Sequence, residues 1–199
     1  MNQIKAVIFD AGGVLVDWRT PFQIFLNQFG LELDSALQIT KDIIVEAELG
    51  KISTDEFCRR VMGKLGHKTE WLNLRKIMPE KFIPLEPTFK LIKEIKRQYR
   101  LALLTNAEVG QIETMDKLWH FKQFFELIID SSVVKLRKPQ PQIFLLVCKR
   151  LALKPEECLF IDDGIDNIQA AEKLGFKTVH FNKPEESVKL IRKILYETV

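Results

Sequence analysis

The chain has 199 residues, of which 46% are hydrophobic and 29% are charged, and its net charge is +3. This length and balance are typical of a globular protein that buries enough apolar surface to fold without disulfide bonds. The basic residues lie in helix-like patterns without interleaved aromatic residues, which does not favour nucleic-acid binding. The three cysteines have no CxxC spacing, which excludes the usual patterns of structural zinc sites and disulfide frameworks.

The N-terminal apolar run is too short for the hydrophobic region of a signal peptide. No segment reaches the roughly 18 consecutive apolar residues that a membrane-spanning helix requires. We therefore expect a cytoplasmic protein without a membrane or nucleic-acid partner.

The first predicted element is a buried strand, Lys5–Asp10, which ends in an acid and breaks into a turn at Gly12 and Gly13. Residues 19–83 then show helical patterns and no convincing strand. We interpret residues 19–83 as an all-helical cap domain inserted into an α/β core domain of residues 1–18 and 84–199. The helices predicted in the insertion are Pro21–Phe29, Asp34–Leu49, Thr54–Leu65 and Glu70–Ile77, with Asp34 and Thr54 as N-cap residues.

From residue 84 onwards, short apolar runs alternate with helical patterns. This alternation predicts an α/β fold with a Rossmann-like parallel sheet that is covered by helices on both faces. The predicted strands are Leu101–Thr105, Leu127–Asp130, Cys158–Ile161 and Lys177–Phe181. The predicted helices are Phe89–Tyr99, Glu108–Leu118, Pro141–Leu151, Ile168–Leu174 and Pro184–Tyr196.

Polar residues follow several of these strands at their carboxyl ends, where open α/β sheets bind their ligands. Asp10 precedes glycines whose backbone N–H groups can cradle a phosphate. Thr105 and Asn106 offer neutral hydrogen-bond donors for an anion. Lys138 is held by Pro139 just before a helix and can neutralise a phosphate.

A fourth segment contains the adjacent carboxylates Asp162 and Asp163, with Asn167 four residues after Asp163. Adjacent carboxylates repel each other unless a cation offsets their charge, and Mg²⁺ prefers oxygen ligands of this kind. The pair therefore indicates a metal site at the end of its strand.

Each segment alone also has a structural interpretation. Asp10 with its glycines can form an ordinary turn, Thr105 and Asn106 can cap a helix, and Lys138 can be a surface residue. Asn167 can likewise be an N-cap. The combination is far more specific, because all four segments lie on one chain in the order Asp, Thr, Lys, Asp-Asp.

In this order and spacing, the four segments resemble the four motifs of the haloacid dehalogenase superfamily, and the resemblance covers essentially the whole chain. The helical insertion is similar to the cap domain of that family. A receiver domain also combines acids, threonine and lysine around a parallel sheet, but it has its acid pair after the first strand and lacks the insertion. The resemblance implies a Mg²⁺-dependent phosphatase.

By this resemblance, Asp10 attacks phosphorus and forms an aspartyl-phosphate, which splits one difficult displacement into two easier ones. Thr105 is expected to hydrogen-bond the phosphoryl group, and Lys138 to balance its charge. Gly13 and Asn106 are expected to contact the substrate, a small phosphorylated metabolite.

The same resemblance implies a Mg²⁺ ion that is held by Asp10, Asp163 and the backbone carbonyl of Gly12. Asp162 and Asn167 are expected to assist directly or through water. The metal would offset the repulsion between an anionic nucleophile and an anionic substrate. The cap domain is expected to close over the substrate and exclude water.

Gly12 departs from the family pattern, because most phosphatases of the family carry a second aspartate two residues after the nucleophile. That aspartate is a general acid, and such groups are typically worth about 10²–10⁴ in rate. One interpretation is that Asp17 replaces it, as in a subgroup that resembles α-D-glucose-1-phosphate phosphatases. Sugar phosphates are then the expected substrates, since an anomeric leaving group needs less protonation.

Two other interpretations remain open. A 2-haloacid dehalogenase also lacks the second aspartate and needs no metal, but it usually has an aromatic residue in place of Gly12 and a cap arginine that Arg19 matches poorly. A non-catalytic binding or regulatory protein could also retain the fold after losing the acid.

The aromatic residues Trp18, Phe22, Phe25 and Trp71 are candidates for lining a substrate pocket. The helical spacing of Phe22 and Phe25 favours the core of the cap domain instead.

Overall fold

The computed structural model describes residues 3–78 and 80–196 of the chain. At its centre is a five-stranded parallel sheet with the strand order β5-β4-β1-β6-β7. The strands are β1 (Ala6–Phe9), β4 (Arg100–Thr105), β5 (Leu127–Asp130), β6 (Cys158–Asp162) and β7 (Lys177–His180). The predicted parallel α/β sheet is confirmed.

The register of the sheet brings three strand ends together. Phe9, the last residue of β1, pairs with Leu103 of β4 on one side and with Ile161 of β6 on the other. Because all three strands run in the same direction, the polar residues that follow them meet at one edge of the sheet.

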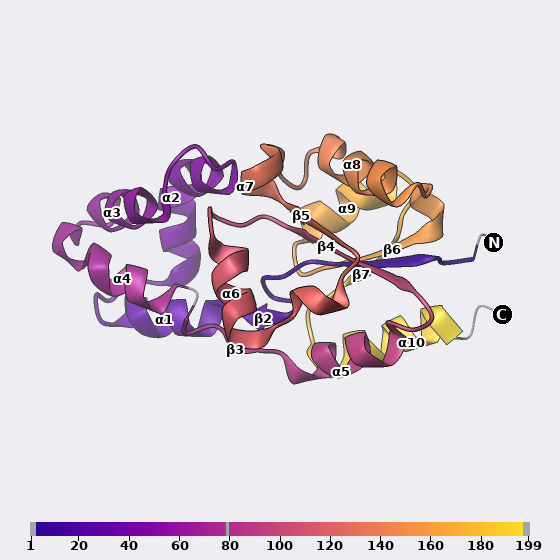
Figure 1. Ribbon diagram of the computed structural model, residues 1–199. Helices are drawn as coiled ribbons and strands as arrows, with labels where there is room; N and C mark the ends of the chain where they lie inside the picture. Colours follow the sequence, from indigo (N-terminus) through magenta and orange to yellow (C-terminus); the bar gives the residue numbers. More distant parts are fainter. Residues whose placement is uncertain (1–2, 79, 197–199) are drawn as a thin grey trace.

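Helices cover both faces of this sheet (Figure 1). Alternate residues of the central strands enter two separate hydrophobic clusters, which is the pattern expected of strands buried on both faces. One cluster includes residues of α5 (Glu86–Ile95), α6 (Gln111–Trp119) and α10 (Pro184–Tyr196). The other includes residues of α8 (Pro141–Leu151) and α9 (Ile165–Lys173). The short helix α7 (Ser131–Val134) and two 3₁₀ turns, Lys122–Phe124 and Pro155–Glu157, complete this part, which we call the α/β lobe.

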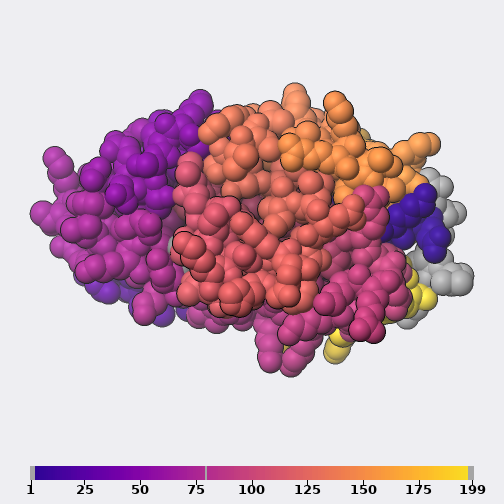
Figure 2. Space-filling view, viewed as in Figure 1, coloured from indigo at the N-terminus to yellow at the C-terminus, as the bar shows by residue number. Residues whose placement is uncertain are grey.

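The other helices form a helical lobe with a hydrophobic core of its own (Figure 1). It consists of α1 (Arg19–Asn27), α2 (Leu33–Glu48), α3 (Thr54–Lys64), a 3₁₀ turn (Lys68–Glu70) and α4 (Trp71–Ile77). In the space-filling view the two lobes touch along a continuous seam (Figure 2). Among the described residues, we find no helix with the length and apolar character needed to cross a bilayer.

The two N-caps predicted in the helical lobe differ from the structure. The N-cap of α3 is Ser53, whose hydroxyl accepts a hydrogen bond from the backbone N–H of Glu56 at 3.2 Å, and Thr54 is the first helical residue. Helix α2 begins at Leu33, one residue before the predicted cap at Asp34. Ser53 and Thr54 are adjacent, as are Leu33 and Asp34, and the sequence alone does not determine which residue of each pair begins the helix.

A short ribbon joins the two lobes and was not predicted. Strand β2 (Val16–Asp17) pairs antiparallel with β3 (Ile83–Pro84), and the N–H of Leu85 donates to the carbonyl of Leu15 at 2.8 Å. A strand of two residues is too short to show the alternation of apolar and polar residues from which strands are predicted. The ribbon brings the chain back to the sheet beside the point at which it left.

Candidate active site

The end of β1 places Asp10 between two other polar strand ends. Thr105 ends β4 and Asp162 ends β6. The exposed fraction is 8% for Asp10, 2% for Thr105 and 0% for Asp162. The N–H of Asp10 donates to the carbonyl of Ile161 at 2.9 Å, which extends the pairing of β1 with β6 to Asp10. The N–H of Ala11 donates to Oδ1 of Asp10 at 2.7 Å and orients its carboxylate.

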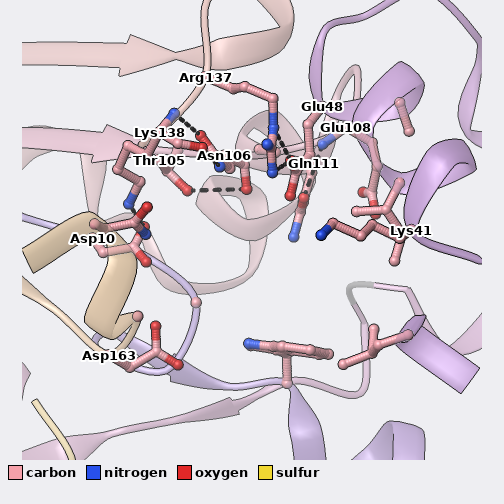
Figure 3. Close-up of a pocket in the computed structure, with 18 of the residues that line it drawn as sticks. Asp10, Lys41, Glu48, Thr105, Asn106, Glu108, Gln111, Arg137, Lys138 and Asp163 are labelled. Carbon is pink, nitrogen blue, oxygen red and sulfur yellow. Dashed lines mark hydrogen bonds and ion pairs between the residues drawn. The ribbon is translucent and has the colours of Figure 1, made fainter. Parts of the chain in front are cut away.

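Lys138 reaches this edge from the loop between α7 and α8 and is only 1% exposed. Its Nζ lies 2.8 Å from Oδ1 of Asp10 and 2.6 Å from Oδ2 of Asp162. Burial disfavours the ammonium, but the two carboxylates outweigh this effect and raise the pKa of Lys138. The lysine is therefore a fixed positive charge beside Asp10 (Figure 3).

Asn106 clamps the backbone of that lysine. Its Oδ1 accepts from the N–H of Lys138 at 2.9 Å, and its Nδ2 donates to the carbonyl of Lys138 at 3.0 Å. Both ends of the amide are thereby engaged with the chain itself. The geometry gives Asn106 a positioning role, which the sequence interpretation as a substrate ligand had not anticipated.

Three carboxylates gather where a cation could bind. Asp10, Asp162 and Asp163 each offer one oxygen, and these oxygens lie within 4.8 Å of one another. Burial raises the pKa of Asp10 to about 8, with Lys138 opposing and the two other acids reinforcing this shift. Burial and the charge of Asp162 also raise the pKa of Asp163 to about 6. This excess of negative charge and the oxygen-only donor set fit a hard divalent cation such as Mg²⁺.

The contacts of Asp162 distinguish it from the other two acids. Its Oδ1 accepts from the N–H of Gly164 at 2.7 Å and from Nδ2 of Asn167 at 2.9 Å, while its Oδ2 faces Lys138. Asp162 and Asn167 therefore form a hydrogen-bonded frame, and Asp10 and Asp163 are the acids better placed to ligate a metal directly. Gly12 lines the same cavity as those two residues.

Gly13 has a conformation and surroundings that only glycine fits. Its φ is +75°, and a Cβ added there would lie 2.2 Å from Oδ2 of Asp163. Gly13 thus leaves room for the carboxylate of Asp163 and borders a separate pocket of about 410 Å³.

Asp17 lies in that separate pocket and does not line the cavity that contains Asp10. Its Oδ1 accepts from the N–H of Thr20 at 3.1 Å, at the start of α1. Arg19 borders the same pocket and forms an ion pair with Asp34. The structure therefore places Asp17 in one pocket with Gly13 and Asp163, but outside the cavity that holds Asp10, Thr105 and Lys138.

The space beside Gly12 is filled by an indole ring. A Cβ at Gly12 would lie 3.0 Å from Cδ1 and 3.1 Å from Nε1 of Trp18. Such contacts are tighter than side chains normally make, so a larger residue at position 12 would require Trp18 to move. Trp18 stands where the family's usual acid would project.

The site opens into a cavity of about 770 Å³ between the two lobes. Trp18 lines it, as the sequence suggested, and so does Phe22, whose helical spacing favoured the core of the helical lobe instead. Phe25 is buried in that core, as its spacing indicated, and Trp71 packs against the core. The helical lobe lines the cavity with mostly apolar side chains, from Phe22, Leu37, Ile44, Ala47, Phe57 and Met78. Phe82, which belongs to a hydrophobic cluster of the α/β lobe, also lines it.

Polar groups occupy the end of the cavity away from Asp10 (Figure 3). Arg137 pairs with Glu48 of α2 at 2.6 Å, across the seam between the lobes. Burial and the charge of Glu48 raise the pKa of Glu108 to about 8. Lys41 and Gln111 complete this end. Sequence reasoning missed Arg137, although its place next to Lys138 was a usable signal.

Comparisons with known proteins agree with this geometry. The sequence model of the haloacid dehalogenase-like hydrolases matches residues 4–175. Phosphoglycolate phosphatase of Salmonella typhi is 33% identical over 90% of this chain and 81% of its own length. Acyl-CoA dehydrogenase family member 10 of Mus musculus is 25% identical over 96% of this chain, which spans 19% of that protein. A HAD family enzyme of Bacteroides thetaiotaomicron, solved as a magnesium complex, is 25% identical and aligns with a TM-score of 0.70 over 89% of this chain and 92% of its own. The chain belongs to the haloacid dehalogenase-like hydrolases.

Proposed function

We propose that the protein is a Mg²⁺-dependent phosphatase that hydrolyses a small phosphomonoester through an aspartyl-phosphate on Asp10. The observation that carries this proposal is that the buried Asp10 and Lys138 lie together with the half-buried Asp163 at one edge of the sheet. The relatedness to a phosphoglycolate phosphatase supports the same reaction class.

In this proposal an oxygen of Asp10 attacks the phosphorus. The contacts found for the Asp10 carboxylate, from Ala11 and Lys138, both fall on Oδ1, so Oδ2 is the better placed nucleophile. Lys138 balances the charge of the phosphoryl group. The Thr105 hydroxyl, which makes only a 3.5 Å contact with the carbonyl of Asn106, donates to a phosphoryl oxygen.

Asp10, Asp163 and the carbonyl of Gly12 would hold the Mg²⁺ ion, with Asp162 and Asn167 orienting the set. When bound, the metal offsets the repulsion between the carboxylate and the phosphate. The apolar helical lobe keeps water from the reacting atoms.

Two variants and a phosphate-release assay test the proposal. We expect Mg²⁺-dependent release of phosphate from acetyl phosphate and simple esters, lost in Asp10→Asn. Asp17→Asn tests the sequence-based prediction that Asp17 supplies the missing proton, and its amide oxygen can still accept from the backbone N–H of Thr20, so the start of α1 is kept. Absence of turnover across all substrates would refute the proposal.

The open alternatives are distinguished by other measurements. A 2-haloacid dehalogenase would release halide from 2-chloropropionate without Mg²⁺. A non-catalytic protein would bind Mg²⁺ and phosphate without turnover.

A further inference from the structure

We infer that the substrate of this site is an aryl phosphate, a phosphate monoester whose leaving group is an aromatic alcohol. The inference rests on the proposed phosphatase activity and names its substrate class. Two separate observations lead to it: the residue beside Gly12 and the wall of the cavity.

The first observation concerns the proton that an ordinary alcohol needs when it leaves. Trp18 fills the space in which a side chain at position 12 would project. An indole N–H donates a hydrogen bond and cannot transfer its proton as a carboxylic acid does. The position that supplies a general acid in most relatives is therefore closed to one.

The other described acids that line the cavity do not replace it. Asp163 belongs to the carboxylate cluster, and Glu48 is paired with Arg137. Glu108 lies with Glu48 at the far end of the cavity (Figure 3), and Asp166 is exposed in the first turn of α9. A leaving group at this site must then depart as an anion.

An aryl phosphate meets that requirement. Transfer to Asp10 forms a bond between a carboxylate oxygen and phosphorus, and the ester oxygen departs with the electron pair of the broken P–O bond. A phenol has a pKa of about 10, like the tyrosine side chain, and its anion leaves unaided and takes a proton from solvent. Water then attacks phosphorus, which releases phosphate and a proton and restores the Asp10 carboxylate.

The second observation is the aromatic character of the cavity wall. Trp18 and Phe22 meet edge to face with centroids 5.8 Å apart, and Phe22 and Phe82 are 6.2 Å apart. Phe57 lines the same cavity. Such a wall suits an aromatic ring, which gains from offset and edge-to-face contacts.

The same wall disfavours a sugar. Of the side chains that the helical lobe contributes to the cavity, the polar ones are Lys41 and Glu48, and Glu48 is already paired with Arg137. Sugar hydroxyls placed against this wall would find few partners, and an unsatisfied hydroxyl costs binding free energy. The remaining polar side chains at the far end of the cavity, Glu108, Gln111 and Arg137, come from the α/β lobe.

A panel of four phosphates in Mg²⁺ tests this inference. Phenyl phosphate and cyclohexyl phosphate match in size and apolar character but differ in leaving group, glucose 6-phosphate is polar, and acetyl phosphate needs little of the cavity. We expect kcat/KM for phenyl phosphate to exceed that for cyclohexyl phosphate and for glucose 6-phosphate by at least about 10²-fold. Across ring-substituted phenyl phosphates, kcat/KM should fall steeply as the pKa of the phenol rises.

The wall is tested by Phe22→Ser, with Ile24→Ser as control because Ile24 is 61% exposed on the same helix. Phe22→Ser should lower the ratio of kcat/KM for phenyl phosphate to that for acetyl phosphate at least about tenfold, and Ile24→Ser should not. Because both substrates are measured in one preparation, the ratio does not depend on the folded fraction.

The outcomes separate the two claims. Turnover of acetyl phosphate together with equal or faster turnover of cyclohexyl phosphate or glucose 6-phosphate overturns the substrate inference and leaves the phosphatase intact. A flat dependence on phenol pKa, or an unchanged ratio in Phe22→Ser, also overturns it. No hydrolysis of any of the four phosphates overturns both claims.

Discussion

Replacement of Gly13 by alanine should disable the metal site through a single methyl group. The new Cβ would lie 2.2 Å from Oδ2 and 2.4 Å from Cγ of Asp163, so the carboxylate must move. Displacing a metal ligand or its immediate support typically costs about 10–100-fold in metal affinity or activity. We expect a loss of Mg²⁺ affinity in this range or above it.

Backbone strain must be separated from that collision, and Gly30 provides the comparison. Gly13 has φ +75° and Gly30 has φ +67°, but a Cβ at Gly30 meets nothing within 4 Å. Alanine in this left-handed conformation costs roughly 1–2 kcal/mol at either site. In a chain of this size, that corresponds to a fall in Tm of about 2–8 °C.

The assay is Mg²⁺ titration by calorimetry, with Tm and phosphatase activity measured on the same samples. Gly13→Ala should lose both stability and Mg²⁺ affinity, and Gly30→Ala should lose stability alone. Equal Mg²⁺ affinity in the two variants would refute the assignment of Asp163 as a metal ligand braced by Gly13.

Three further predictions follow from the contacts of the site. Asn106→Ala removes two hydrogen bonds to the backbone of Lys138, each worth about 0.5–1.5 kcal/mol, and steady-state kinetics should show kcat falling more than KM rises; an unchanged kcat would contradict the clamp. In the folded chain without metal, the pKa values of Asp10 and Glu108 are raised to about 8, so both groups keep their protons up to that pH. In the unfolded chain the same groups lose their protons near the ordinary pKa values of 3.8 and 4.5. Stability measured by thermal melts should therefore fall as the pH rises from about 4 to about 8, and saturating Mg²⁺ should reduce the slope; a stability that rises across this window would contradict the assignment. The Glu48–Arg137 ion pair joins the two lobes, and its side chains are 17% and 23% exposed. A double-mutant cycle with Glu48→Gln and Arg137→Gln should therefore give a coupling free energy of about 1 kcal/mol. A coupling of zero would show that this contact does not hold the lobes together.

The parallel sheet was predictable because its strands are buried on both faces and read as short apolar runs. The strand at Leu127–Asp130 was predicted to the residue, and β1, β4, β6 and β7 differ only at their ends. The β2–β3 ribbon was not predictable, since its pairing of Val16 with Pro84 depends on the whole helical lobe folding between the two strands.

Part of the candidate site was also predictable from the sequence and part was not. Asp10, Thr105, Lys138 and the acid pair follow strands or a fixed loop, so chain order revealed them. Contacts between side chains and distant parts of the chain could not be predicted from the sequence. The clamp by Asn106 joins residues 32 positions apart, and the indole of Trp18 folds back over Gly12. Asp17 lies seven residues after Asp10, and this spacing likewise does not determine on which side of the β2–β3 ribbon the Asp17 carboxylate lies.

The most direct test of the central claim is a search for phosphate on Asp10. The protein is mixed with acetyl phosphate and Mg²⁺, quenched in acid during turnover, and digested for mass spectrometry. We expect one phosphoryl group on the peptide that contains Asp10, and none in Asp10→Asn or without Mg²⁺. Phosphate release without this adduct, or a phosphoryl group on another residue, would contradict the account.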